Sequence, residues 1–317
     1  MKTLGFVFPG QGSQHVGMLS DMVESFTVVS DTFAEAGDVL GYDMAALCLS
    51  NPNEQLNQTQ FTQPALLTAS VAMWRAFQSK TEIKPGLMAG HSLGEYSALV
   101  CAGAINFSDG LNVVSRRGEF MQDAVPEGEG ALAAIIGLDN EAVAELCLEM
   151  AEGDVLTPAN FNSPGQVVIA GTIAAVKRVL DVAKSKGAKL AKQLPVSVPS
   201  HSLLMKPAAE RLKAVLDGVE VSVPSISVVN NVDVSVLEDP DAIRDALLRQ
   251  LVSPVQWTNT IKYFTSHNVS TVIECGPGKV LTGLNKRIDR NLQLTSICDL
   301  DTLSQSIDTL TQQEVSR

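Results

Sequence analysis

The sequence is poor in several features that mark specialised classes of protein. Aromatic residues make up only 5% of its 317 residues, and no apolar stretch is long enough to span a bilayer. Positive charge is also scarce: 23 Lys and Arg are outnumbered by 35 Asp and Glu, which gives a formal net charge of −12. Because nucleic acids and membrane surfaces are themselves anionic, this balance argues against both as general partners.

Cysteine is sparse and dispersed. An odd number of cysteines without a Cys-x-x-Cys pair indicates reduced thiols, and it argues against a disulfide framework or a zinc site. Residues 1–5 run directly into an expected strand and lack the pattern of a signal peptide. We therefore expect a soluble, cytoplasmic protein without a metal site. The cysteines are Cys48, Cys101, Cys147, Cys275 and Cys298.

The order of expected strands and helices divides the chain. A chain of this length is expected to form about two domains. Strands and helices alternate over residues 1–125 and again from 198 to 317. Between 126 and 197 the order becomes β-α-β-β-α-β, which is the ferredoxin-like pattern. We therefore predict an α/β fold whose large domain, 1–125 and 198–317, carries an inserted ferredoxin-like small domain at 126–197.

Hydrophobic periodicity, turn residues and capping residues set the expected elements. A tail helix is expected to dock through Leu303, Ile307 and Leu310, which recur at helical spacing. Residues Ser108 and Asp109 are expected to cap one helix. Expected strands cover 4–8, 87–89, 131–138, 155–161, 166–170, 189–194, 226–229 and 271–274, and expected helices cover 21–40, 63–77, 93–102, 108–123, 140–151, 172–186 and 240–251.

One serine lies in a setting that favours catalysis. The segment Gly90-His91-Ser92-Leu93-Gly94 follows an expected strand and precedes an expected helix. Gly-x-Ser-x-Gly between a strand and a helix forms a sharp turn that exposes the serine hydroxyl. The helix start also directs free backbone N–H groups toward a reacting carbonyl oxygen. We therefore predict that Ser92 is an acyl-accepting nucleophile.

A serine nucleophile needs a base, and the chain has four histidines. His91 adjoins Ser92, so its side chain is expected to point away from the serine hydroxyl. His201 precedes an apolar helix, a position that fixes a side chain, but these residues alone leave a catalytic and a structural role equally open. His15 and His267 lie in no comparable setting. No Asp or Glu is evident as the third member of a triad.

Arg117 has an unusual position on its expected helix. Its neighbours at three and four residues are Val113, Val114, Phe120 and Met121, so it lies on the apolar stripe without an intrahelical acid. An inward arginine is costly unless it meets an anion. Either a distant carboxylate satisfies it or a ligand does, and a planar guanidinium suits a substrate carboxylate. The helix alone does not decide between these two.

Ordered motifs run along nearly the whole chain. They occupy 8–14, 62–66, 90–96, 116–118, 160–166, 196–201, 250–257 and 274–278. In this order they resemble the malonyl-CoA:acyl carrier protein transacylases of bacterial fatty acid synthesis. The resemblance implies a large domain related to the α/β-hydrolases with an inserted ferredoxin-like domain. It also implies a cytoplasmic acyltransferase that takes a coenzyme A thioester as substrate and needs no cofactor and no metal.

The resemblance assigns roles to residues at the matching positions. Ser92 would be the nucleophile and His201 the base. Arg117 would bind the malonyl carboxylate. A backbone carbonyl near Gln250 would orient the histidine, which would explain the missing acid. The backbone N–H groups of Gln11 and Leu93 would form the oxyanion hole.

The implied reaction has two steps and two partners. Ser92 would take the malonyl group from malonyl-CoA, and the phosphopantetheine thiol of acyl carrier protein would then remove it. Val198, Pro199 and Ser200 before the histidine resemble the fatty acid synthesis form. They differ from the His-Ala-Phe-His and Tyr-Ala-Ser-His patterns of polyketide-type acyltransferases. The alternatives are a polyketide-type acyltransferase, a serine thioesterase or esterase, and a non-catalytic carrier-binding component.

A basic cluster offers a hypothesis about how the carrier protein docks. Carrier proteins of this pathway are acidic, and so is this chain, so net charge cannot attract the partner. A solvated charged face is the default interpretation of the cluster, and steering of the carrier protein is the alternative. The cluster consists of Lys177, Arg178, Lys184, Lys186, Lys189 and Lys192, and a second candidate set consists of Lys279, Lys286, Arg287 and Arg290.

Overall fold

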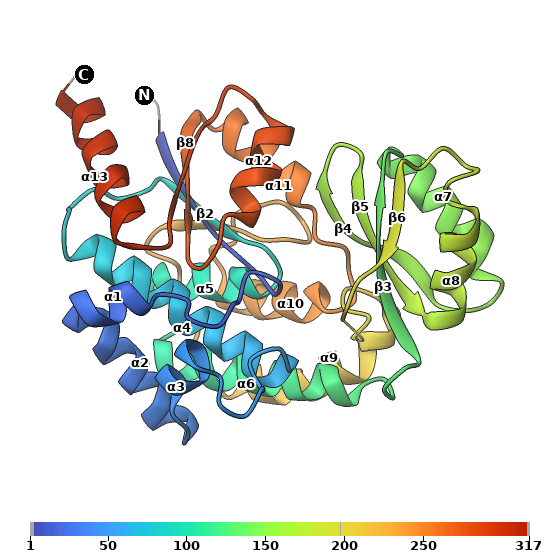
Figure 1. The fold of residues 1–317 in the computed structure, drawn as a ribbon, viewed down its shortest axis with the longest axis horizontal. Coiled ribbons are helices and arrows are strands. Elements are labelled where there is room, and N and C mark those ends of the chain that lie inside the picture. The colour runs from blue at the N-terminus through green and yellow to red at the C-terminus, as the bar shows by residue number, and fades with distance from the viewer. Residues whose placement is uncertain (1–2, 197, 316–317) are drawn as a thin grey trace.

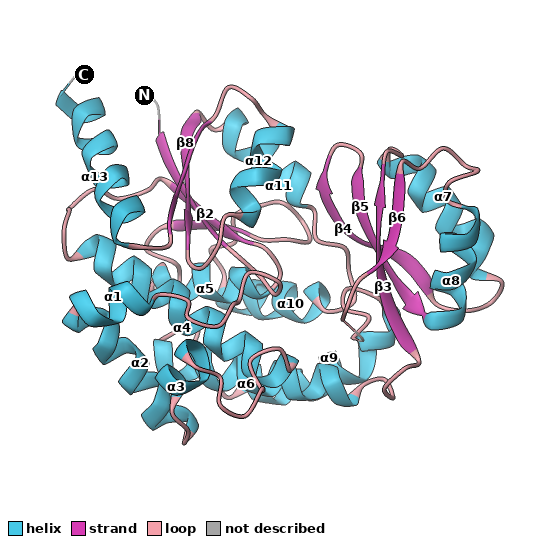
Figure 2. Ribbon diagram, in the orientation of Figure 1, coloured by secondary structure: helices cyan, strands magenta, loops and turns pink. Residues whose placement is uncertain are grey.

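The computed structural model describes residues 3–196 and 198–315. Two β-sheets, one parallel and one antiparallel, organise this part of the chain (Figure 2). Residue 197, at the predicted domain boundary and within the predicted motif 196–201, lies outside the described residues, as do residues 1, 2, 316 and 317. The predicted fold class is confirmed: the protein is α/β, with a parallel sheet and a separate antiparallel sheet.

The parallel sheet has five strands in the order β7-β2-β1-β8-β9. Its central strand alternates between two cores, because successive side chains of a strand point to opposite faces. Phe6 and Phe8 lie in one hydrophobic cluster and Val7 lies in another. Helices therefore cover both faces, as a parallel sheet requires. The strands are β1 (Thr3–Phe8), β2 (Leu87–Gly90), β7 (Ser227–Val229), β8 (Val269–Cys275) and β9 (Gln293–Ile297).

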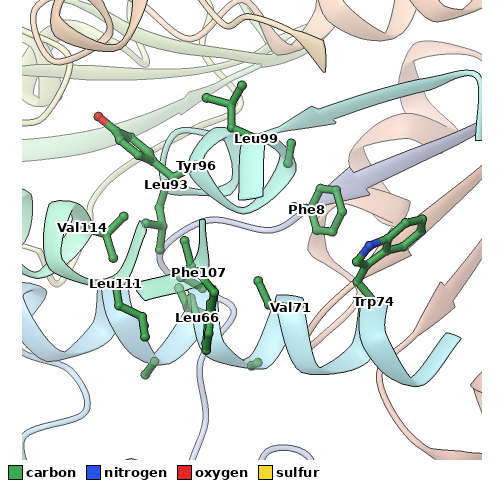
Figure 3. Packing of buried hydrophobic residues seen from close by; sticks show 14 of the residues in the cluster. Phe8, Leu66, Val71, Trp74, Leu93, Tyr96, Leu99, Phe107, Leu111 and Val114 are labelled. Carbon is green, nitrogen blue, oxygen red and sulfur yellow. The ribbon is translucent and has the colours of Figure 1, made fainter. Parts of the chain in front are cut away.

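Helices from distant parts of the chain form these two layers (Figure 1). One layer holds α4 and α5, and Figure 3 shows Phe8 beside Trp74 of α4, with Leu93 and Tyr96 of α5 farther along the same cluster. The other layer holds α11 and α12. The helices of this part are α1 (Ser20–Ser25), α2 (Thr27–Leu40), α3 (Met44–Leu49), α4 (Thr59–Gln78), α5 (Leu93–Cys101), α6 (Phe107–Asp123), α9 (Lys206–Asp217), α10 (Pro240–Gln250), α11 (Trp257–Ser266), α12 (Val280–Ile288) and α13 (Leu300–Val315), with a 3₁₀ turn, η1 (Leu203–Met205), before α9.

The antiparallel sheet has the order β4-β5-β3-β6. Numbered within this unit, the order is 2-3-1-4, and two helices pack on one face around their own hydrophobic cluster. This arrangement confirms the predicted ferredoxin-like order. Its elements are β3 (Gly130–Ile136), α7 (Asn140–Ala151), β4 (Leu156–Ser163), β5 (Gln166–Thr172), α8 (Ile173–Val182) and β6 (Leu190–Gln193).

Several expected helix boundaries were wrong. The helix expected over 172–186 ends at Val182. The helix expected over 21–40 is interrupted at Phe26, whose backbone is extended with φ −125°. The helix expected from Gln63 begins at Thr59, so Pro64 lies inside it and does not mark its first turn. The cap of α6 is Asn106, which accepts a hydrogen bond from the Asp109 N–H at 2.8 Å.

The tail helix α13 docks as predicted. Leu303 and Leu310 are buried and Ile307 is partly buried. No helix within the described ranges has the length and apolar character needed to cross a membrane.

The two sheets are joined along β4. The Phe161 N–H donates to the Val255 carbonyl, and the Val255 N–H donates to the Ala159 carbonyl, both at 2.9 Å. The Thr258 hydroxyl also donates to the Phe161 carbonyl at 3.0 Å. These contacts fasten the antiparallel sheet beside the carboxyl ends of the parallel strands. This is the edge at which open α/β sheets bind ligands.

Candidate active site

Ser92 occupies a strained turn between β2 and α5. Its backbone has φ 53° and ψ −108°, a conformation that is rare for a residue with a side chain and costs about 1–3 kcal/mol. The flanking glycines are required by close packing. A Cβ at Gly90 would lie 1.8 Å from the Gly94 carbonyl carbon, and one at Gly94 would lie 2.1 Å from the Phe8 carbonyl oxygen. The motif therefore allows the tight turn that places Ser92 beyond the end of β2.

Asn231 holds this turn from just beyond β7, the strand that pairs with β2. Its Oδ1 accepts the Ser92 N–H at 2.8 Å, and its Nδ2 donates to the Gly90 carbonyl at 2.7 Å. Asn231 itself is completely buried. One side chain thus pairs backbone groups on both sides of the turn, and this offsets part of the strain at Ser92.

Replacing Asn231 by alanine should weaken the reactivity of Ser92. The Asn231→Ala variant leaves the Ser92 N–H and the Gly90 carbonyl unpaired, so we expect a loss of about 1–3 kcal/mol in unfolding free energy. Displacement of the hydroxyl should lower the rate of serine acylation by roughly tenfold to a hundredfold. Denaturant titration and acyl-enzyme formation measure the two effects.

The adjacent asparagine provides a matched control for this variant. Asn230 is also buried, but its side chain bonds to Ser235, Val232 and Asp233 instead of the turn. Asn230→Ala should destabilise the fold without slowing acylation of the folded enzyme. Equal slowing by both variants would contradict the role given to Asn231.

His201 lies against the serine. Its Nε2 is 2.8 Å from the Ser92 Oγ, and its Nδ1 is 2.7 Å from the Gln250 carbonyl oxygen. The carbonyl can only accept, so Nδ1 carries the proton and Nε2 accepts from the hydroxyl. Burial, together with the positive charge of Arg117, lowers the pKa of His201 to about 3. The imidazole is therefore neutral, and its unprotonated Nε2 faces the hydroxyl.

Arg117 is buried beside the same hydroxyl. Its Nη2 lies 3.3 Å from the Ser92 Oγ and 3.0 Å from the Gln250 Oε1, and its Nη1 donates to the Gln63 Oε1 at 2.7 Å. The guanidinium carbon lies 5.3 Å from the centre of the Tyr96 ring. The Nε has no hydrogen-bond partner within the described ranges. Two neutral amides thus hold a full positive charge next to the Ser92 hydroxyl.

No carboxylate of residues 3–196 or 198–315 forms an ion pair with Arg117. The first of the two sequence alternatives, direct pairing with a distant carboxylate, is therefore not what the structure shows. The cation remains available to an anionic ligand.

A pocket of about 110 Å³ opens above these residues, between the two sheets. Ser92, His201 and Arg117 belong to its polar lining, together with Gln11, and Leu93 also lines the pocket. The backbone N–H groups of Gln11 and Leu93 donate to no acceptor within the described part of the chain. The apolar wall comes from α6, from the antiparallel sheet and from the segment that follows β6, through Met121, Leu132, Val168, Leu194, Val196 and Val198.

The other histidines lie outside this constellation. His91 turns away from the serine, and its Nε2 lies 2.8 Å from the Asn162 Oδ1 of β4. His267 caps α11 and contacts the Tyr263 carbonyl, and His15 is exposed. No group of three or more His, Cys, Asp or Glu side chains in the described ranges could hold a metal ion.

Sequence reasoning missed four residues that shape the site. Gln63, Tyr96 and Asn231 contact Arg117 or the serine turn, and Glu95 contacts Gln250 and Asn231. Glu95 is in the first turn of α5, where an acid is ordinarily explained by the helix dipole. The burial of Glu95 in the structure indicates a further role for this side chain. The local sequence does not predict that burial.

Comparison with known proteins places this site in a family. The family model described as "Acyl transferase domain" matches residues 5–296. The malonyl CoA-acyl carrier protein transacylase of Salmonella typhimurium is 56% identical over 307 residues, covering 97% of this chain and 99% of that protein. The protein of the same name from Bacillus subtilis is 44% identical over 314 residues, covering 99% of each chain.

Solved structures agree with this assignment. An acyl carrier protein S-malonyltransferase from Vibrio cholerae superposes with a TM-score of 0.94 at 55% identity, covering 96% of this chain and 99% of that one. A malonyl-transacylase in complex with its type II PKS acyl-carrier protein gives a TM-score of 0.95 at 55% identity, covering 97% and 99%. The chain belongs to the acyl transferase family, as a member of its malonyl CoA-acyl carrier protein transacylases.

Proposed function

We propose that this enzyme transfers the malonyl group from malonyl-CoA to the phosphopantetheine thiol of acyl carrier protein, and so supplies extender units for fatty acid synthesis. The observation that carries the proposal is the Arg117 guanidinium 3.3 Å from the Ser92 Oγ, buried and without an ion-pair partner in the described ranges. An ordinary esterase needs no cation at this point. An acyl group that bears a carboxylate does.

The first step forms a malonyl-serine ester. His201 Nε2 accepts the hydroxyl proton as the Ser92 Oγ attacks the thioester carbonyl carbon. The N–H groups of Gln11 and Leu93 donate to the resulting oxyanion, which explains why they are left free by the fold. Collapse of the tetrahedral intermediate breaks the carbon–sulfur bond, and coenzyme A leaves with the proton from His201.

The second step reverses the first with another thiol. The carrier thiol gives its proton to His201 and attacks the ester carbonyl, and the serine leaves with that proton. Both half-reactions use the same residues, so the kinetics should be ping-pong. Neither step needs a metal or a bound cofactor.

The proposal also covers the residue that orients His201, the domain limits and the location of the enzyme. We assign the Gln250 carbonyl to orienting His201, since it accepts the Nδ1 proton. We assign residues 1–125 and 198–317 to the catalytic domain and 126–197 to the inserted domain, because the parallel and antiparallel sheets divide along these limits. A cytoplasmic location fits the reduced thiols that the dispersed cysteines indicate.

Incubation with radiolabelled malonyl-CoA tests the proposed reaction. We expect a stable labelled enzyme that passes its label to holo carrier protein. Rapid release of free malonate would instead identify a hydrolase, and the absence of any label would identify a non-catalytic component. Methylmalonyl and acetyl donors, run in parallel, separate this enzyme from the polyketide-type alternative.

The basic cluster is partly neutralised in the fold. Arg178 pairs with Asp154 and Lys186 pairs with Glu149, each at 2.8 Å. Lys184, Lys189 and Lys192 are exposed and have no ion-pair partner within the described ranges. The strand β6 carries Lys192 and leads directly to the pocket wall at 194 and 196. This supports a role in steering an acidic carrier protein.

Charge reversal tests that role. The combined change Lys184→Glu, Lys186→Glu and Lys189→Glu should lower kcat/KM for carrier protein by about tenfold at low salt, with a smaller effect at high salt. Acylation by malonyl-CoA should not change. The control is Lys80→Glu with Lys84→Glu, which reverses exposed charges before the amino end of β2. Unchanged carrier kinetics at low salt would exclude this cluster as the docking site.

A further inference from the structure

Gln250 contacts Ser92, His201 and Arg117 through its side-chain amide and its backbone carbonyl. Its backbone carbonyl accepts from His201. Its side-chain Oε1 accepts from the Arg117 Nη2 at 3.0 Å, and its Nε2 donates to the Ser92 carbonyl at 3.1 Å. The Nε2 also donates to the Glu95 Oε2 at 2.7 Å. The amide therefore has a definite direction, with its oxygen toward the arginine and its nitrogen toward the acid.

Glu95 is the charged group that sets this direction, through a shorter hydrogen bond than the one to the Ser92 carbonyl. It is 2% exposed, and its Oε2 also accepts the Asn231 N–H at 3.1 Å. A carboxylate can only accept hydrogen bonds, so it must be approached by the NH₂ end of Gln250. The opposite end, the carbonyl oxygen, is then the only one that can point toward Arg117. A reversed amide would aim its donors at a guanidinium that itself only donates.

We propose that Glu95 is a positioning residue for the acyl carboxylate: it fixes the direction of the Gln250 amide, and this amide holds Arg117 in place to bind the substrate. The inference rests on the proposed function, because it concerns how the arginine receives a malonyl group. Glu95 forms no hydrogen bond with Arg117, and it does not line the pocket. The hydrogen-bonded path from Glu95 to Arg117 runs through Gln250, and a direct electrostatic attraction acts beside it.

The proposal predicts that donor selectivity depends on pH. Burial raises the pKa of Glu95 to about 7, against the opposing effects of Gln250, Asn231 and Arg117. Above this pH the group is a carboxylate and only accepts. As the pH falls through about 7 it gains a proton that can donate, and it no longer enforces one direction of the amide.

The charged groups around Glu95 do not titrate in the same range. Arg117 on α6 remains a cation, and Arg249 holds the pKa of Asp233 below its usual value, so Asp233 remains an anion. The low pKa of His201 keeps that side chain neutral. Tyr96 on α5 has a pKa raised by burial to about 12, so it stays protonated. The change near neutral pH therefore belongs to Glu95.

The ratio of malonyl to acetyl acylation rates isolates the effect, because only the malonyl group needs Arg117. In the wild-type enzyme this ratio should fall as the pH drops from about 8 to about 6. Glu95→Gln, whose amide can donate as well as accept, should lower malonyl kcat/KM about tenfold while acetyl kcat/KM stays within about twofold. The ratio in this variant should no longer depend on pH.

Glu274→Gln is the matched control. Glu274 is another buried acid, but it accepts from the Leu281 and Thr282 N–H groups at the start of α12. This variant should keep the wild-type ratio and its pH dependence. A wild-type ratio that is flat across the pH range would overturn the inference even if Glu95→Gln did not fold. A wild-type enzyme that takes no malonyl group would instead overturn the proposed function.

Discussion

Ser92→Ala should abolish formation of the acyl-enzyme and reduce malonyl transfer by about 10⁵-fold or more. The hydroxyl is the only group that the strained turn places 2.8 Å from the His201 Nε2. Removing a nucleophile removes the covalent route, and what remains is the effect of binding and of the oxyanion donors. Mass spectrometry of the intact protein after exposure to malonyl-CoA measures the effect directly.

The fold should survive this substitution. The Ser92 backbone groups, not its hydroxyl, bond to Asn231 and Gln250. Thermal unfolding of the variant should therefore match that of the wild type within a few degrees. A mass shift of one malonyl group on a well-folded Ser92→Ala enzyme would show that another residue is the nucleophile.

Arg117→Ala should lower malonyl kcat/KM by about 10³-fold and leave acetyl transfer intact or improved. The change removes the one buried cation that the described residues place beside the hydroxyl, so the malonyl carboxylate would have to leave water without a partner. An acetyl group has no carboxylate and loses nothing. Acylation rates measured with both donors give the comparison.

A second arginine on the same helix serves as the control. Arg116 is exposed and pairs with Glu119 at 2.7 Å. Arg116→Ala should therefore leave the acylation rates with both donors unchanged. Equal losses with malonyl and acetyl donors in Arg117→Ala would contradict carboxylate binding. That result would mean that the arginine organises the serine and histidine.

Local sequence signals predicted most of the fold, and one of the errors lies beside a contact between distant residues. The helix α7 begins and ends at the predicted residues, because Asp139 caps its start through the Ala142 N–H. The interruption at Phe26 has no comparable signal nearby. The helix before it is tied to the tail, where the Leu300 N–H donates to Asp21 across 279 residues. Propensity alone would continue that helix.

As with the fold, the parts of the site that depend on local patterns were predictable from the sequence. A local turn motif identified Ser92, and helical periodicity identified Arg117 as an inward cation. Asn231 and Glu95 carry no such pattern, because their partners lie 139 and 155 residues away in the chain. Buried polar side chains of this kind can be recognised only when the fold brings their partners together.

The spread of these partners has a consequence for measuring the protein. The surroundings of Ser92, the proposed nucleophile, come from segments near residues 11, 117, 201, 231 and 250, which meet only when both halves of the parallel sheet are complete. In a fragment or a partly unfolded chain, we expect Ser92 to be present but unreactive toward malonyl-CoA. The moles of malonyl group bound per mole of chain therefore count the correctly assembled molecules in a preparation. On heating, the moles of malonyl group bound per mole of chain should fall over the same temperature range as tertiary structure is lost.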